Sequence, residues 1–134
     1  MLRQRAESPA LLNGHEAARR FLGSYFDVQD MECEQLLVAH VDSQARCIHV
    51  ERYQGMPTAV GLPVRDILAD ALRLGSSGVI LAHNHPSGDP RPSESDYRAT
   101  RKLARAAEVI DLAVLDHLIF GARDYSSMRQ MGLL

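Results

Sequence analysis

The sequence predicts an α/β fold in which a β-sheet carries helices on both faces. Two observations support this class. Short apolar runs typical of strands alternate along the chain with longer segments whose apolar residues recur at helical spacing. One of the runs, Val79–Ala82, is uninterrupted and follows Gly78, which is typical of a strand buried on both faces. The alternation supports the class but leaves the order of the strands open.

Length and composition set the outer limits of this prediction. The chain has 134 residues, which gives room for a single domain with one core, over residues 1–134. Its hydrophobic content of 46% and charged content of 24% are ordinary for a globular protein. A formal net charge of −2 argues against the basic surface that binding along a phosphate backbone requires.

The cysteines and the N-terminus bear on where the protein works. Cys33 and Cys47 form no CxxC pair and predict no disulfide framework, as expected for a reducing compartment. Residues 1–12 contain charges but lack the apolar segment of a signal peptide, and we expect them to form a loose arm. No stretch is long and apolar enough to span a membrane. We therefore expect a cytoplasmic protein that has no membrane partner.

The individual elements follow from local patterns. Asn13, with Glu16 three residues later, predicts a capped helix start. Alternating and apolar runs predict strands, helical spacing predicts further helices, and glycine and proline mark the ends. The predicted elements are a helix over 13–25, strands Leu36–Val41 and Cys47–Tyr53, a helix Val64–Leu74, the buried strand Val79–Ala82, a helix Glu94–Val109, and closing strands Leu112–Leu115 and Asp116–Phe120.

The buried strand leads into His83-Asn84-His85. Side chains two residues apart on an extended backbone point to the same face, so we expect both imidazoles to lie together. A rigid loop with three prolines follows and ends at Ser93, where a helix begins. Asp96 lies in the first turn of that helix and faces the histidines across the loop. Two imidazoles and one carboxylate supply three metal ligands and leave a fourth position for water.

Each part of this motif also has a simpler explanation. A pair of histidines can merely end a strand in a polar way, and Ser93 with Asp96 three residues later forms a capping box without any metal. The combination is more specific than its parts. A buried strand delivers both imidazoles to its carboxyl end, where sites form in open α/β folds. The combination therefore favours a metal site.

The motif resembles that of a known family. His83-x-His85, seven residues, Ser93, two residues and Asp96 matches the signature of the JAMM (JAB/MPN) zinc metallopeptidases. The longer string His-Asn-His-Pro-Ser-Gly-Asp-Pro-x-Pro-Ser-x-x-Asp resembles its bacterial RadC branch, and the resemblance covers residues 36–134. It implies the MPN/JAB architecture, a mixed sheet flanked by helices and similar to cytidine deaminases. The helix-hairpin-helix module of fuller RadC proteins has no counterpart here.

The resemblance also implies a mechanism. His83, His85 and Asp96 would hold Zn²⁺, which imidazole nitrogen favours over Mg²⁺, and the ion would lower the pKa of a bound water to about 7. The family keeps a glutamate upstream of the histidines, and alignment of the strand hairpin puts Glu51 in its place as general base and then acid. An exposed strand face explains Glu51 without any function. Ser93 would hydrogen-bond the oxyanion or position the water.

The resemblance therefore predicts a zinc-dependent hydrolase acting on an unidentified peptide or isopeptide substrate. One alternative is a DNA repair or recombination factor, which the RadC name suggests and the net charge opposes. The other is an inert scaffold, which the intact motif opposes. The family also keeps Asp116-His117, either to support the site or to stabilise the fold. No motif decides the oligomeric state, and a homo-oligomer is compatible with the sequence. The DNA alternative draws on one basic helix face, formed by Arg98, Arg101, Lys102 and Arg105.

Overall fold

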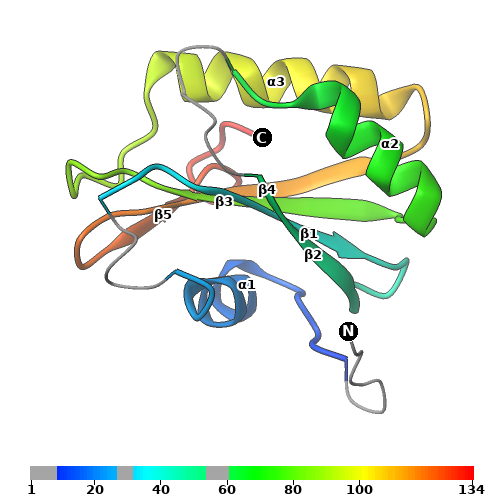
Figure 1. Cartoon of the computed structure of the whole chain (residues 1–134), viewed down its shortest axis with the longest axis horizontal. Coiled ribbons are helices and arrows are strands. Elements are labelled where there is room, and N and C mark those ends of the chain that lie inside the picture. The colour runs from blue at the N-terminus through cyan, green and yellow to red at the C-terminus, as the bar shows by residue number, and fades with distance from the viewer. Residues whose placement is uncertain (1–8, 27–31, 54–60) are drawn as a thin grey trace.

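The computed structural model describes residues 9–26, 32–53 and 61–134, which form three helices and one sheet (Figure 1). The predicted α/β class is confirmed. Two strands and one helix have the predicted bounds, because local patterns alone define them. The elements are α1 (His15–Gly23), β1 (Leu36–Val41), β2 (Cys47–Tyr53), α2 (Val64–Leu74), β3 (Gly78–Asn84), α3 (Glu94–Glu108), β4 (Ala113–Phe120) and β5 (Tyr125–Ser127).

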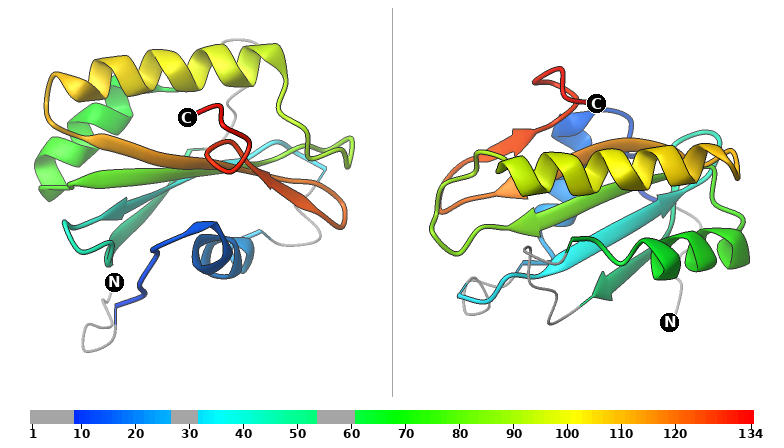
Figure 2. Two further views of the ribbon diagram at one scale, coloured as in Figure 1. Left: turned by 180° about the vertical axis from the view of Figure 1, so that it is seen from behind. Right: turned by 90° about the horizontal axis from the view of Figure 1, so that it is seen from above.

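The sheet is mixed and has the strand order β2-β1-β3-β4-β5. β1 runs antiparallel to both β2 and β3, β3 runs parallel to β4, and β4 runs antiparallel to β5. The crossover through α3 joins the parallel pair, as parallel neighbours require. α2 and α3 cover one face of the sheet and α1 the other (Figure 2). The central strand β3 is buried along its whole length, as its apolar run predicts.

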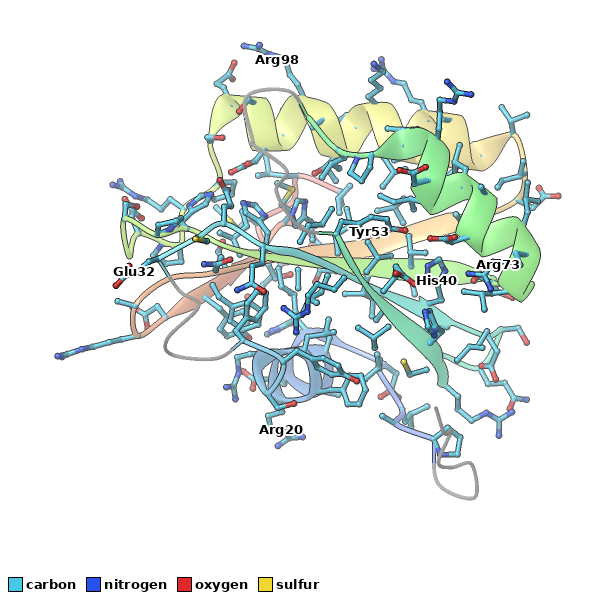
Figure 3. All side chains as sticks on the ribbon, viewed as in Figure 1. Arg20, Glu32, His40, Tyr53, Arg73 and Arg98 are labelled. Atoms are coloured by element: carbon cyan, nitrogen blue, oxygen red, sulfur yellow. The ribbon has the colours of Figure 1, made fainter. Side chains whose placement is uncertain are left out.

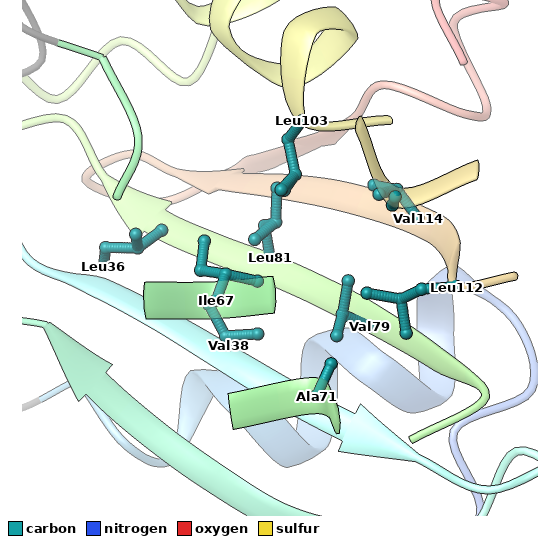
Figure 4. Close-up of a cluster of buried hydrophobic side chains, with 10 residues drawn as sticks. Leu36, Val38, Ile67, Ala71, Val79, Leu81, Leu103, Leu112 and Val114 are labelled. Carbon is teal, nitrogen blue, oxygen red and sulfur yellow. The ribbon is translucent and has the colours of Figure 1, made fainter. Parts of the chain in front are cut away.

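Alternating side chains of the central strands feed two hydrophobic cores, one on each face of the sheet. Val79 and Leu81 of β3 point toward α2 and α3, whereas Ile80 and Ala82 point toward α1. Figure 4 shows the first core, in which Ile67 of α2 and Leu103 of α3 close over β1 and β3. The two cores together fix β3, which carries the histidine motif at its carboxyl end.

The N-terminal region differs from the prediction. Residues 1–12 are predicted as a loose arm, but Leu11 forms an antiparallel bridge with Arg46, and Leu12 is buried. Residues 1–8 lie outside the described residues. The capping residue of α1 is Gly14 rather than Asn13, and no side chain caps this helix. The φ of Gly14 is 117°, a conformation that favours glycine and that a propensity argument for Asn13 misses.

The C-terminal region also differs from the prediction. The residues predicted as two closing strands around a bend form the single strand β4, with a bulge where Val79 and Ile80 of β3 pair with Val114 and Asp116. The short strand β5 then completes the sheet. None of the helices in the described ranges is both long enough and apolar enough to cross a membrane.

His40 is a buried titratable group far from the histidine motif. It lies on β1 beneath α2, close to Arg73 (Figure 3), and its Nδ1 is 2.8 Å from Ser76 Oγ. Its Nε2 is buried and has no hydrogen-bond partner among the described residues. Burial, with a smaller effect of nearby His49, lowers the pKa of His40 to about 4. In the unfolded chain its pKa returns to about 6.5.

His40 should therefore make the fold sensitive to acid. As the pH falls from about 6.5 toward 4, the unfolded chain takes up this proton first, so folding loses about 1.4 kcal/mol per pH unit. We expect His40→Gln to reduce the slope of the free energy of unfolding against pH, measured by urea unfolding between pH 7.5 and 5. His49→Gln, at a half-exposed position, should keep most of the slope. An unchanged slope in His40→Gln would contradict this assignment.

Candidate metal centre

His83 and His85 project from the carboxyl end of β3 onto the face covered by α3. The His85 amide donates a hydrogen bond of 2.9 Å to Phe120 O, which continues the β3–β4 pairing one residue beyond the strand. This extended backbone points both imidazoles to the same side, and their ring centroids lie 4.8 Å apart. The structure thus brings the two histidines together as the spacing predicts.

Asp96 reaches the same point from the first turn of α3. The capping box predicted for this helix is present: Ser93 Oγ accepts from the Asp96 amide at 3.0 Å, and Asp96 Oδ2 accepts from the Ser93 amide at 2.9 Å. Asp96 Oδ2 also lies 3.0 Å from His85 Nε2, and Oδ1 lies 3.5 Å from His83 Nε2. The cap therefore holds the carboxylate against both rings, and the structural and metal-binding explanations apply to the same side chain.

The proline-rich loop between the histidines and Asp96 is fastened to the β4–β5 turn. Gly88 O accepts from the Ala122 amide at 3.0 Å, and Ser126 Oγ donates to Pro90 O at 2.5 Å. The approach is so close that a Cβ on Gly121 would lie 2.3 Å from Gly88 O. Only glycine fits there, and the contact fixes the distance between the two halves of the motif.

Glu34, which the sequence does not predict as a site residue, completes the cluster. Its Oε2 lies 3.4 Å from His83 Nε2, and ligand atoms of Glu34, His83 and His85 all lie within 4.8 Å of one another. The strand register explains this position. Leu36 of β1 pairs with His83, so Glu34, two residues earlier, faces the level of His85 on the same side of the sheet.

Asn84, the residue between the two histidines, holds the backbone on either side of Glu34. Its Oδ1 accepts from the Gln35 amide at 2.8 Å, and its Nδ2 donates to Cys33 O at 3.0 Å. Because the histidines point to one face, the side chain between them is available for the neighbouring backbone. The motif His83-Asn84-His85 thus supplies two imidazoles and also positions the Glu34 carboxylate.

Glu51, which the sequence predicts beside the metal-bound water, does not join the cluster of Glu34, His83 and His85. It pairs with Val38 of β1, which in turn pairs with Leu81 of β3. Glu51 is therefore two strands away from β3, about 10 Å across the sheet, and level with a residue that precedes His83. Its Oε1 accepts a hydrogen bond of 2.8 Å from His49 Nε2 on the half-exposed face of β2.

Ser93 is engaged mainly in the helix cap. Its hydroxyl oxygen accepts from the Asp96 amide and lies 3.2 Å from Ser95 Oγ. A cavity beside the cluster is lined by Ser95 together with Glu34, His83 and Asp96. Ser93 therefore contacts Ser95, which lines the cavity, but does not line the cavity itself. Its hydroxyl proton is not used by the cap.

The protonation of these groups tests whether the site fits a metal. His85 Nδ1 lies 2.8 Å from Asp89 O, and since a carbonyl only accepts, Nδ1 carries the proton. In a neutral ring, His85 Nε2 then has a lone pair, which faces the lone pairs of Asp96 Oδ2. His83 Nε2 is buried without a hydrogen-bond partner among the described residues and faces oxygens of Glu34 and Asp96. Imidazole nitrogens and carboxylate oxygens that converge at these distances fit a cation.

Asp116 and His117 have separate roles. His117 Nε2 lies 2.7 Å from His83 Nδ1, in direct contact with the cluster. Burial lowers the pKa of both His83 and His117, which keeps the two rings neutral. Asp116 accepts from the amides of His117 and Arg129 and from the Ser127 hydroxyl, and so fastens the C-terminal turn to β4.

Comparison with known protein families agrees with this geometry. The model of the RadC-like JAB domain matches residues 12–133. The matched region contains the whole sheet, all three helices and every residue of the cluster described above. The chain belongs to the RadC-like JAB domain family.

Proposed function

We propose that this domain is a zinc-dependent amide hydrolase of the metallopeptidase type, with His83, His85 and Asp96 as ligands. The observation that carries the proposal is the convergence of two imidazole nitrogens and a carboxylate that the helix cap holds in place. Two nitrogens and one oxygen suit zinc, with a position left open for catalysis. Zinc bound there supplies Lewis acidity and lowers the pKa of water to about 7.

The two carboxylates of the site, Asp96 and Glu34, have different roles in this proposal. The Asp96 side chain is 3% exposed and fixed by the helix cap, which suits a ligand. The Glu34 side chain is 21% exposed and projects from the segment before β1, so it can exchange protons with solvent. We assign to Glu34 the general base that takes a proton from the attacking water and returns it to the leaving amine.

The serines beside the cluster provide hydrogen-bond donors for the developing oxyanion. The Ser93 oxygen accepts from the cap and leaves its proton to donate, either directly or through Ser95 Oγ at 3.2 Å. In this proposal Ser93 serves fold and chemistry through one atom, because accepting from a backbone amide and donating a proton are compatible for a hydroxyl.

Cleavage of an amide library tests the proposal directly. The protein, loaded with zinc, is incubated with linear peptides of varied sequence and with lysine-linked isopeptides, and new amine ends are identified by mass spectrometry. We expect cleavage that a chelator abolishes and added zinc restores. Cleavage no greater than that of an Asp96→Asn variant would count against the hydrolase and favour the inert scaffold. With both Cys33 and Cys47 free, we propose the reducing cytoplasm as the setting.

A second candidate, a DNA-associated factor, is favoured by the outer face of α3. Arg98 points away from the sheet (Figure 3), and the Arg101 guanidinium lies 5.8 Å from the Tyr97 ring centre. Arg98 is already paired with Glu94 at 2.6 Å, which weakens its attraction for a phosphate partner. A shallow hollow on this face is lined by Tyr97, Arg98, Arg101, Lys102 and Arg105.

DNA binding is expected to be weak and to vanish at physiological salt, because few cations can contact phosphates at once. Fluorescence anisotropy with labelled duplex and single-stranded DNA, repeated over a salt series, measures this. Submicromolar binding at physiological salt that Arg101→Ala with Arg105→Ala reduces would promote the DNA-associated function above the hydrolase.

A further inference from the structure

A chain of buried hydrogen bonds leads from His83 away from the metal centre and back to α3. His83 Nδ1 lies 2.7 Å from His117 Nε2, and His117 Nδ1 lies 2.7 Å from Thr100 Oγ1. Thr100 Oγ1 in turn lies 2.8 Å from the backbone carbonyl of Asp96, one helical turn earlier. His117 and Thr100 are both buried, so water cannot substitute for either partner.

The carbonyl at the end of the chain determines the direction of every bond in it. A carbonyl only accepts, so the Thr100 hydroxyl donates its single proton to Asp96 O. The Thr100 oxygen must then accept from His117, which places the proton of His117 on Nδ1 and a lone pair on Nε2. That lone pair accepts from His83 Nδ1–H. His83 Nε2 is therefore left unprotonated, and it faces Glu34 and Asp96.

The opposite direction is disfavoured by the same geometry. If the Thr100 hydroxyl donated to His117 instead, two oxygens would face each other at 2.8 Å with no proton between them. Two oxygens at hydrogen-bond distance repel each other when no proton lies between them, and only donation from Thr100 to the carbonyl removes this repulsion. The Asp96 carbonyl thus decides which ring nitrogen carries the proton in both His117 and His83.

We propose that Thr100 and His117 are positioning residues that set the tautomer of His83 before any metal binds. The proposal rests on the proposed function only in taking His83 as a ligand. Groups that hold the second nitrogen of a ligand histidine commonly fix its tautomer and orientation. Here the same turn of α3 supplies one ligand, through the Asp96 carboxylate, and sets another, through the Asp96 carbonyl and Thr100.

The tautomers can be read in the metal-free protein. Long-range ¹H–¹⁵N correlation spectra of imidazole-labelled protein, recorded at pH 8 with chelator, distinguish protonated from unprotonated ring nitrogens. We expect both His83 and His117 to carry their proton on Nδ1. A His83 ring protonated on Nε2 would overturn the inference. This measurement needs no variant and therefore stands even where a substitution harms folding.

Two variants of Thr100 test the consequence for metal binding. Thr100→Val has nearly the same shape but no hydroxyl, so we expect it to change the tautomers and to weaken Zn²⁺ binding by about 10–100-fold, measured by competition with a chromophoric chelator. Thr100→Ser keeps the hydroxyl and should restore both properties. Wild-type tautomers and zinc affinity in a folded Thr100→Val protein would overturn the inference.

The outcome separates this inference from the proposed hydrolase. Zinc binding with both rings protonated on Nδ1, but without amide cleavage, would remove the proposed function and leave the positioning role intact. Zinc-dependent cleavage by a protein whose His83 carries its proton on Nε2 would support the proposed function and remove the positioning role.

Discussion

Replacing His85 with alanine is expected to empty the metal centre, whereas the wild-type protein should retain close to one zinc per chain. The substitution removes one of three ligands. The two that remain, His83 and Asp96, are too few to retain zinc during purification. Loss of a group that only supports a ligand already costs about 10–100-fold in affinity, so loss of the ligand itself should cost more. His85 is also the more exposed of the two histidines, so its truncation should disturb the fold less.

Elemental analysis of protein purified without chelator measures this effect. His49→Ala is the matched control, because His49 is a histidine on the same sheet whose side chain hydrogen-bonds to Glu51 on β2. The control should keep its zinc. A wild-type protein that carries no transition metal, and that takes up none when zinc is added, would contradict the metal centre. Zinc retained by His85→Ala at wild-type level would remove His85 from the ligand set.

The elements that local patterns define were predictable from the sequence. Leu36–Val41, Cys47–Tyr53 and Val64–Leu74 have the predicted bounds, because an apolar run or a helical repeat is complete within each segment. The histidine motif belongs to the same class, since its two imidazoles share a face on any extended backbone. Asp96 was predictable because its helix begins at a recognisable cap.

Glu34 was not predictable in this way, because its position depends on contacts distant in sequence. The register that pairs Leu36 with His83 and the hydrogen bonds from Asn84 bring it to the cluster, and neither is encoded in the residues around Glu34. Glu51, by contrast, lies on a strand that the sequence places correctly. The register then puts Tyr53, not Glu51, at the level of Leu36 and His83. The strand is therefore predicted correctly, but its register keeps Glu51 away from the level of His83.

Glu34→Gln is expected to leave zinc in place and to lower the rate of amide cleavage by about 10²–10⁴-fold, the usual contribution of a general base. Glutamine has nearly the same shape and can still accept a hydrogen bond, so the segment held by Asn84 should keep its position. It cannot take up the proton of the attacking water. The loss should therefore appear in kcat at constant zinc content, measured on any amide that the wild-type protein cleaves.

Glu51→Gln is the matched control, since it makes the same chemical change on β2, where the carboxylate bonds to His49. We expect it to keep both zinc and nearly the full rate, because Glu51 lies two strands from β3. Two results would reject this assignment. A zinc-loaded Glu34→Gln protein with the wild-type rate would leave the hydrolase without its base. Loss of activity in Glu51→Gln, with Glu34→Gln active, would return that role to β2 and require a rearrangement of the sheet that the strand register opposes.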